Sequence, residues 1–317
     1  MISSKHDKTY PLDILYTWHV ALITNTIDAC TQRFWSDLGI GPWHYVPFEF
    51  AEADARVNGK NTALRISAAV TQVGFLTLGF DQPLTSPNPY ADMLLKRGGG
   101  AHHLAFAVAD EDMARRQMRE FGYGELLAAD RIGPSGEGAA GYFDTVADLG
   151  TIIELSKVPA ELPPIGKVFP SPGDAARSGP ISVRETLHVT IATHDVERSV
   201  HFYEKVLGLG PWAVTTLGAS GSYQGRTIQH TVKRAVTRIG TFVLALEQPI
   251  GPGGPLRAFI DSNGQGIHRI AFAVDDIHEA TPEMERLGHA STFCTSESAY
   301  FDTEKTFGTM IELATPR

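Results

Sequence analysis

Ala101-His102-His103-Leu104-Ala105-Phe106-Ala107-Val108 has the composition of a buried strand, and the predicted fold depends on it. An earlier stretch, Trp18-His19-Val20-Ala21-Leu22-Ile23, has the same pattern of a histidine followed by alternating small and bulky apolar residues. Neighbouring side chains of a strand point to opposite faces, so each histidine shares a face with the alanine two residues later. His19 and His103 are therefore expected to face one cavity.

A third stretch adds a carboxylate to the two histidines. Glu154 interrupts the apolar run 150–155, on which nothing else is charged. Two imidazoles and a carboxylate on rigid strands suit a divalent metal that keeps open positions for a substrate. A lone strand histidine is more often structural, so the metal hypothesis depends on the three residues acting together.

Composition limits the classes of protein to consider. A chain of 317 residues with 43% hydrophobic content can form two ordinary domains with cores. The net charge of -9 and the scattered lysines and arginines disfavour nucleic acid as a partner. Apolar runs fall well short of the roughly 20 residues of a membrane span, and the first ten residues lack the apolar core of a secretory signal. Two cysteines fit a reducing compartment, so we expect a cytoplasmic protein.

An internal repeat defines the domain organisation. The histidine at 19 recurs at 188, and Leu-Gly-Ile-Gly-Pro-Trp at 38–43 recurs as Leu-Gly-Leu-Gly-Pro-Trp at 207–212, both at an offset of 169. Ala-Phe-Ala-Val at 105–108 recurs at 271–274, and Tyr-Phe-Asp-Thr at 142–145 recurs at 300–303. The predicted organisation is an N-terminal tail (1–13), a first domain (14–157), a proline-rich linker (158–182) and a second domain (183–317).

Each repeat predicts the same order of elements. Helices are expected from Thr26 to Leu38 and from Asp110 to Phe121, because each has a capping residue before it and a glycine after it. Their counterparts run over 195–207 and 275–287. Asn58-Gly59 predicts a tight hairpin turn, and the segments 83–100 and 248–264 are interpreted as loops. The pattern is βαβββ twice per domain, an α+β fold with a curled mixed sheet and helices on its outer face.

The repeated βαβββ pattern, the paired histidine strands and the closing Tyr-Phe-Asp-Thr…Gly-Thr-Ile-Ile-Glu-Leu resemble the vicinal oxygen chelate superfamily. This group includes glyoxalase I, methylmalonyl-CoA epimerase, fosfomycin-resistance proteins and extradiol dioxygenases. The resemblance implies two tandem domains, each with a metal-binding cup. It covers roughly residues 14–157 and 183–314. It says little about the reaction, because this fold hosts many chemistries.

The resemblance places His19, His103 and Glu154 at the metal-ligand positions of the first domain. In the second domain His188 and Glu312 match, but Arg269 replaces the second histidine, and His268 should point away from the cavity. We therefore expect one divalent metal per chain (Fe, Mn, Co, Ni or Zn) and one degenerate site. If half-domains are exchanged, as in some relatives, His188 would replace His19.

The remaining candidates have competing interpretations. The resemblance places the fourth ligand position at Thr77, a poor ligand, and Asp81 is about 13 Å further along the strand, too far to substitute directly. Thr77, Arg269 and His44 are candidate substrate contacts. An ion pair with Glu312 is the favoured role for Arg269, and packing is the alternative for His44. Tyr142 is a candidate proton donor near the metal, although packing would also explain it.

Three functions remain open. The first is an isomerase, epimerase or lyase that acts on a small substrate with vicinal oxygens through a metal-stabilised enolate, with Glu154 as the base. The second is an Fe(II) dioxygenase of the extradiol type, and the third is a non-catalytic binding or resistance protein. The expected partner is the small-molecule substrate, with a second copy of the chain as a candidate.

Overall fold

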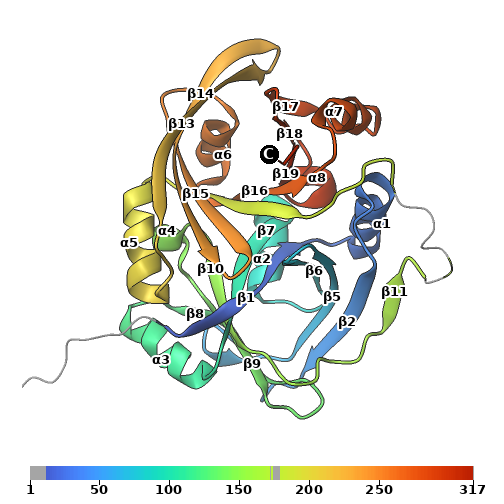
Figure 1. Ribbon diagram of the computed structural model, residues 1–317. Helices are drawn as coiled ribbons and strands as arrows, with labels where there is room; N and C mark the ends of the chain where they lie inside the picture. Colours follow the sequence, from blue (N-terminus) through green and yellow to red (C-terminus); the bar gives the residue numbers. More distant parts are fainter. Residues whose placement is uncertain (1–11, 172, 174–178, 317) are drawn as a thin grey trace, which may run out of the picture.

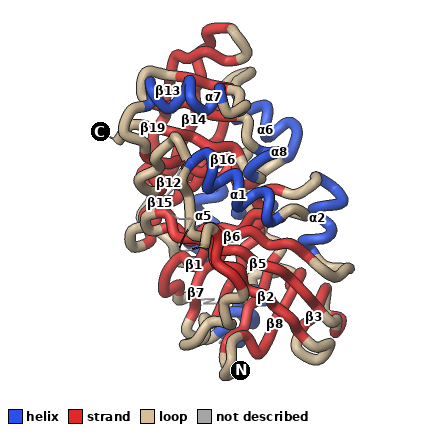
Figure 2. The backbone as a smooth tube through the Cα atoms, turned by 90° about the vertical axis from the view of Figure 1, so that its right-hand side faces the viewer, coloured by secondary structure: helices blue, strands red, loops and turns tan. Residues whose placement is uncertain are grey.

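The computed structural model describes residues 12–171, 173 and 179–316, which form two sheets with helices packed on them (Figure 1). The expected tail at 1–13 lies outside the described residues except for its last two. The sheets lie one above the other along the long axis of the molecule (Figure 2). No helix among the described residues is long and apolar enough to cross a membrane.

The first sheet has eleven strands in the order β11-β2-β5-β6-β1-β7-β10-β9-β8-β3-β4. The two strands that carry His19 and His103 are neighbours, because β1 pairs antiparallel with β7. On its other side β7 pairs parallel with β10, the strand that carries Glu154. The strands are β1 (Ile14–Ile23), β2 (Trp43–Phe50), β3 (Ala55–Val57), β4 (Lys60–Asn61), β5 (Leu64–Val73), β6 (Leu76–Pro83), β7 (Gly100–Val108), β8 (Glu125–Ile132), β9 (Gly138–Phe143), β10 (Ile152–Lys157) and β11 (Lys167–Phe169).

The second sheet closes into a barrel in the order β12-β15-β14-β13-β17-β18-β19-β16. Here β12 and β16 repeat the pairing of β1 and β7, and β16 pairs parallel with β19 as β7 does with β10. The strands are β12 (Thr186–Ala192), β13 (Ala213–Tyr223), β14 (Arg226–Ile239), β15 (Phe242–Ile250), β16 (Gly266–Ala273), β17 (Ser291–Cys294), β18 (Ser298–Phe301) and β19 (Met310–Ala314). The predicted α+β fold with two tandem domains is confirmed.

The four predicted helices form within a residue or two of their expected bounds. They are α1 (Ile27–Leu38), α3 (Glu111–Glu120), α5 (Val196–Leu207) and α7 (Ile277–Arg286). Gly39 and Gly208 end α1 and α5 in the left-handed conformation, as their positions after the apolar pattern predict. Two further helices, α4 (Val146–Leu149) and α8 (Glu304–Phe307), are single turns after the Tyr-Phe-Asp-Thr segments.

The interpretation of 83–100 and 248–264 as loops is wrong. These segments contain α2 (Pro89–Arg97) and α6 (Pro255–Asn263), each beginning with a proline at its first position. The side chain of Asn88 accepts the hydrogen bond of the Ala91 amide and caps α2. Each helix is only nine residues long and lies beside glycines, which hid the helical pattern. Part of the expected linker, β11, adds a strand to the first sheet beside β2.

The two domains share one hydrophobic core. Phe34 of α1 packs against Phe307 of α8, with ring centroids 4.5 Å apart. On the other side of the interface Tyr203 of α5 donates a 2.9 Å hydrogen bond to the carbonyl of Leu149 in α4. Figure 1 shows these two helix pairs on opposite sides of the interface, with β7 and β16 between them. The repeat therefore gives the interface an internal two-fold pseudosymmetry.

Candidate metal centre and its cavity

Three adjacent strands of the first sheet carry the predicted metal ligands. His19 lies on β1, His103 on β7 and Glu154 on β10, and Glu154 pairs in register with Ala105, two residues beyond His103. Alternation along the strands turns all three side chains to the concave face. Because the strands are bonded to one another over their length, the three ligand positions are fixed by the backbone.

The three side chains converge on one point. Oε2 of Glu154 lies 2.9 Å from Nε2 of His103 and 3.4 Å from Nε2 of His19. The two Nε2 atoms are 3.0 Å apart, and one ligand atom from each residue lies within 4.8 Å of the others. His103 and Glu154 are buried, whereas the side chain of His19 is 16% exposed. A substrate would therefore approach the cluster from the His19 side.

The donor set fits a divalent metal. Oε2 of Glu154 is buried and has no well-formed hydrogen bond among the described residues, despite the two nearby imidazoles. Burial by itself would raise the pKa of Glu154, but His19 and His103 outweigh it and hold that pKa well below its usual range. Two imidazole nitrogens and a carboxylate oxygen that stays ionised are the ligands that such metals prefer.

Two neighbouring side chains orient the ligands. Ser156 donates a short hydrogen bond to Oε1 of Glu154, which leaves Oε2 for the cluster. Nδ1 of His103 lies 2.9 Å from Nδ1 of His102. A metal ligand that binds through Nε2 carries its proton on Nδ1, so His102 must accept that proton in a hydrogen bond. Burial lowers the pKa of His102 well below its usual value and keeps it a neutral acceptor.

The cluster opens into a cavity of about 470 Å³ whose walls are mostly apolar. His44 on β2 lines it, and its buried Nδ1 has no hydrogen-bond partner among the described residues. Tyr142 on β9 also lines it, and its ring centroid lies 5.1 Å from that of His103. Thr77 reaches the cavity as well, but its hydroxyl donates a 2.9 Å hydrogen bond to Gln72.

A second carboxylate, Asp81 on β6, lines the same cavity. Burial raises the pKa of Asp81, and the nearby His103 and His19 counteract part of that increase, so its charge is within reach of both imidazoles. Asp81 is not among the described residues whose ligand atoms cluster together, so its being too far away to act as the fourth ligand stays a prediction. That Asp81 lines the same cavity was not foreseen from the sequence. The signal was present in the repeat, because Asp81-Gln82-Pro83 aligns with Glu247-Gln248-Pro249.

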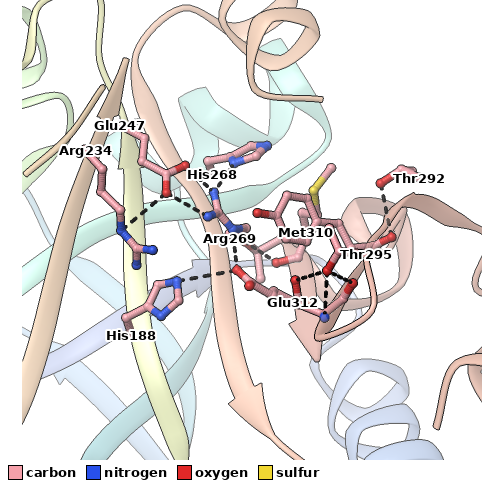
Figure 3. A network of polar contacts seen from close by, with 12 residues as sticks. His188, Arg234, Glu247, His268, Arg269, Thr292, Thr295, Met310 and Glu312 are labelled. Atoms are coloured by element: carbon pink, nitrogen blue, oxygen red, sulfur yellow. Dashed lines mark hydrogen bonds and ion pairs between the residues drawn. The ribbon is translucent and has the colours of Figure 1, made fainter. Parts of the chain in front are cut away.

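In the second domain, Arg269 takes the place of a metal. It donates from Nε to Glu312 over 2.7 Å, and from its two terminal nitrogens to Glu247 over 2.8 and 2.9 Å. Figure 3 shows the guanidinium between these two carboxylates, with Arg234 beside Glu247 and His188 beside Glu312. The side chain of Arg269 is only 2% exposed. The favoured ion pair with Glu312 is present, and Glu247 is an additional partner.

His188 stays within the second domain. Its Nε2 lies 3.4 Å from Oε2 of Glu312, as His19 lies from Glu154 in the first domain. The first cluster thus contains His19, and the exchanged arrangement with His188 is not the one this chain adopts. His268 was expected to point away from the cavity, and its ring packs against Phe259 of α6, with centroids 4.9 Å apart.

Comparisons with known proteins agree with this architecture. The family model for the Glyoxalase/Bleomycin resistance protein/Dioxygenase superfamily matches residues 18–141 and 187–302. The chain belongs to this superfamily. The two matched regions begin within β1 and β12, the first strands of the two cups, so each domain is a superfamily module in its own right.

Relatives within the superfamily include epimerases. The chain is 30% identical over 107 residues to methylmalonyl-CoA epimerase of Dictyostelium discoideum and 26% identical over 125 residues to that of Mus musculus. These matches cover 33% and 38% of the chain, and 58% and 65% of the relatives. The chain thus spans about three-fifths of the length of these two epimerases.

The fold also matches a solved structure over nearly its whole length. A triple mutant of 4-hydroxymandelate synthase from Streptomyces coelicolor superposes with a TM-score of 0.61 at 18% identity, covering 97% of this chain and 94% of that one. At this identity the likeness shows the fold alone. The superfamily's characteristic use of a divalent metal agrees with the His19, His103 and Glu154 cluster, the part of the predicted site that the structure brings together.

Proposed function

We propose that this chain is a metal-dependent enzyme that removes a proton next to a carbonyl group of a small oxygenated substrate, as isomerases, epimerases and some lyases do. One observation carries the proposal: a second carboxylate, Asp81, lines the cavity into which the His19, His103 and Glu154 cluster opens. A bound divalent metal would supply Lewis acidity at that cluster. Proton transfer then needs a base beside the ligands, and Asp81 supplies it without removing Glu154 from the cluster.

The other cavity residues have roles that follow from their chemistry. Burial raises the pKa of Tyr142 well above its usual value, so its hydroxyl keeps its proton and can donate a hydrogen bond to a substrate oxygen. The unpartnered Nδ1 of His44 is a further polar contact. A ring of apolar side chains surrounds the apolar part of the substrate: Phe48, Phe50, Leu64, Ile66, Leu127 and Ile132.

The cavity also limits the substrate. Its volume of about 470 Å³ is typical of sites for small ligands. Lys157 is the one lysine or arginine among the described residues that line it, so we expect the enclosed part of the substrate to carry little negative charge. Methylmalonyl-CoA, the compound in the name of the epimerase relatives, is a reasonable test compound. Its thioester end would enter the cavity, and its phosphates would lie outside.

The test begins with metal content. Protein prepared without oxygen or chelators should contain one equivalent of a divalent metal, and His103→Ala should contain none. The protein is then incubated in D₂O with methylmalonyl-CoA and with small 2-hydroxy and 2-oxo acids, and deuterium incorporation is followed by NMR. We expect exchange at the carbon next to the carbonyl without consumption of oxygen.

Two variants assign the base. Asp81→Asn should keep its metal and lose exchange by about 100-fold or more, the usual contribution of a general base. Asp92→Asn, an exposed residue of α2, is the matched control and should exchange at the wild-type rate. Iron together with oxygen uptake on catechols would instead identify the chain as a dioxygenase. Bound metal with no turnover of either kind would identify a binding protein.

A further inference from the structure

A second cavity, of about 400 Å³, lies between the two domains on the side of α1 and α8. Its lining includes Thr24 and Asn25, which follow β1, the glycines that precede β7, and Glu304 and Lys305 of α8. The described residues that line this cavity and those that line the cavity of the metal cluster have no member in common, so the two cavities are separate.

The pseudosymmetry of the interface supplies a counterpart for this cavity. On the opposite side Thr193 and His194 follow β12, Gln265 precedes β16, and α4 takes the place of α8. The correspondence is fixed by register, because Ile23 pairs with Gly100 as Ala192 pairs with Gly266. Gln265 and Gly99 therefore occupy equivalent positions, because Gln265 directly precedes Gly266 and Gly99 directly precedes Gly100.

The side chain of Gln265 fills its side of the interface. Its Oε1 accepts hydrogen bonds from the Thr193 hydroxyl over 2.7 Å and from the His194 amide over 2.9 Å. Its Nε2 donates to the carbonyls of Val146 and Ala147 over 2.9 and 3.1 Å. The four contacts join the two domains through one primary carboxamide.

On the other side the equivalent residue is a glycine, so that position supplies no carboxamide, although Asn25 and Asn263 line the cavity. The groups that would face it are retained: Thr24 stands for Thr193, and Glu304 and Lys305 stand for Val146 and Ala147. Each threonine hydroxyl also has a partner on the following helix. Oγ1 of Thr24 lies 3.3 Å from Sγ of Cys30, and Oγ1 of Thr193 lies 2.8 Å from Oγ of Ser199. Gly99 cannot simply carry a longer side chain, because a Cβ there would lie 2.4 Å from the carbonyl of Ile23.

We propose that the cavity between the domains binds a small molecule through a primary carboxamide, which takes the place that Gln265 fills on the other side. The carboxamide oxygen accepts from the Thr24 hydroxyl and the Asn25 amide, and its NH₂ group donates to the backbone carbonyls of Glu304 and Lys305. The rest of the ligand extends past Gly98, Gly99 and Gly100 towards the exposed Arg97. The site stands on the interface alone and is independent of the metal and of the proposed reaction.

The probe is propionamide, which is the side chain of glutamine cut from its backbone. Amide resonances of the full-length protein are followed by NMR during titration into the wild type. Shifts should cluster at Thr24, Asn25, Gly99 and Lys305. N,N-dimethylpropionamide keeps the acceptor and loses both donors, so it should bind at least tenfold more weakly. Equal shifts with both compounds, or no shifts, would overturn the proposal.

Two variants complete the test. Thr24→Val keeps the shape of the side chain and removes its hydroxyl, and it should weaken propionamide binding by about tenfold, the effect of one lost hydrogen bond. Gln265→Ala removes the internal carboxamide, so propionamide should produce a second set of shifts at His194 and Ala147 with the same preference over the dimethyl compound. Unchanged binding in Thr24→Val, or no second site in Gln265→Ala, would show that the pseudosymmetry does not predict the ligand.

Discussion

Nε of Arg269 donates to Oε2 of Glu312 over 2.7 Å, with the arginine at the strand position that His103 occupies in the first domain. A guanidinium thus replaces both the second histidine and the metal charge. It forms ion pairs with two buried carboxylates, Glu247 and Glu312. Burial alone would raise the pKa of Glu247, but the charge of Arg269 outweighs it and lowers that pKa to about 2. The second domain retains the ligand geometry of a metal cup and stabilises it with an ion pair.

The variant Arg269→His should restore a metal site in the second domain. It would place a second imidazole beside Glu312 and His188, whose Nε2 is buried without a hydrogen-bond partner among the described residues. We expect metal content to rise from one to two equivalents per chain. Arg269→Leu is the control, because it removes the same charge without adding a metal ligand, and it should remain at one. A folded Arg269→His protein with one equivalent would contradict the prediction.

The same arginine should dominate the stability of the second domain. Arg269→Gln leaves Glu312 buried without its cation and Glu247 with Arg234 alone, and the loss of one partner from a buried ion pair costs about 3–5 kcal/mol. Urea denaturation should show this loss in the free energy of unfolding. Arg286→Gln, which breaks an exposed pair with Glu283, should cost less than about 1 kcal/mol. Equal effects of the two substitutions would be inconsistent with a buried network.

His102 should control the affinity of the first site for metal. His102→Phe removes the acceptor that holds His103 in the tautomer with a free Nε2, and the loss of such a partner lowers metal affinity by about 10- to 100-fold. His102→Asn supplies an amide oxygen and should recover part of it. The equivalent change in the other domain, His268→Phe, should leave affinity unchanged. Metal affinity is measured by competition with a chromogenic chelator. Equal losses of affinity in His102→Phe and His268→Phe would argue that His102 has a purely structural role.

How much the sequence predicts depends on whether a pattern or a distance is being inferred. His19, His103 and Glu154 could be found because strand alternation and the internal repeat are both visible as patterns. Asp81 was considered only as a replacement ligand, and its place in the lining of the same cavity could not be predicted because it depends on how the strands are arranged in space. The short helix α2 and the strand β11 were missed because each depends on contacts with other elements.

Gly98 and Gly99 should differ in their tolerance of a side chain. Both have positive φ angles, +76° and +113°, so alanine at either position costs about 1–2 kcal/mol of backbone energy. A Cβ on Gly98 would meet nothing within 4 Å, whereas on Gly99 it would clash with the carbonyl of Ile23. Gly99→Ala should therefore lose about 1–3 kcal/mol more than Gly98→Ala in urea denaturation. Equal losses would mean that the loop before β7 moves away from β1 at little cost.

Protonation of His268 should make the fold sensitive to acid. Burial, reinforced by Arg269, lowers the pKa of His268 from 6.5 to about 3, so the unfolded chain binds its proton first. Its contribution to stability is therefore complete above pH 6.5 and is lost as the pH falls from 6.5 towards 3. Between pH 7 and pH 5 this histidine should account for about 2 kcal/mol of the free energy of unfolding. His268→Phe should lose that part of the pH dependence, which urea denaturation at the two pH values measures directly. An unchanged pH dependence in the variant would mean that His268 accepts a proton in the folded protein, and its hydrogen bond from Arg269 would then have to be broken.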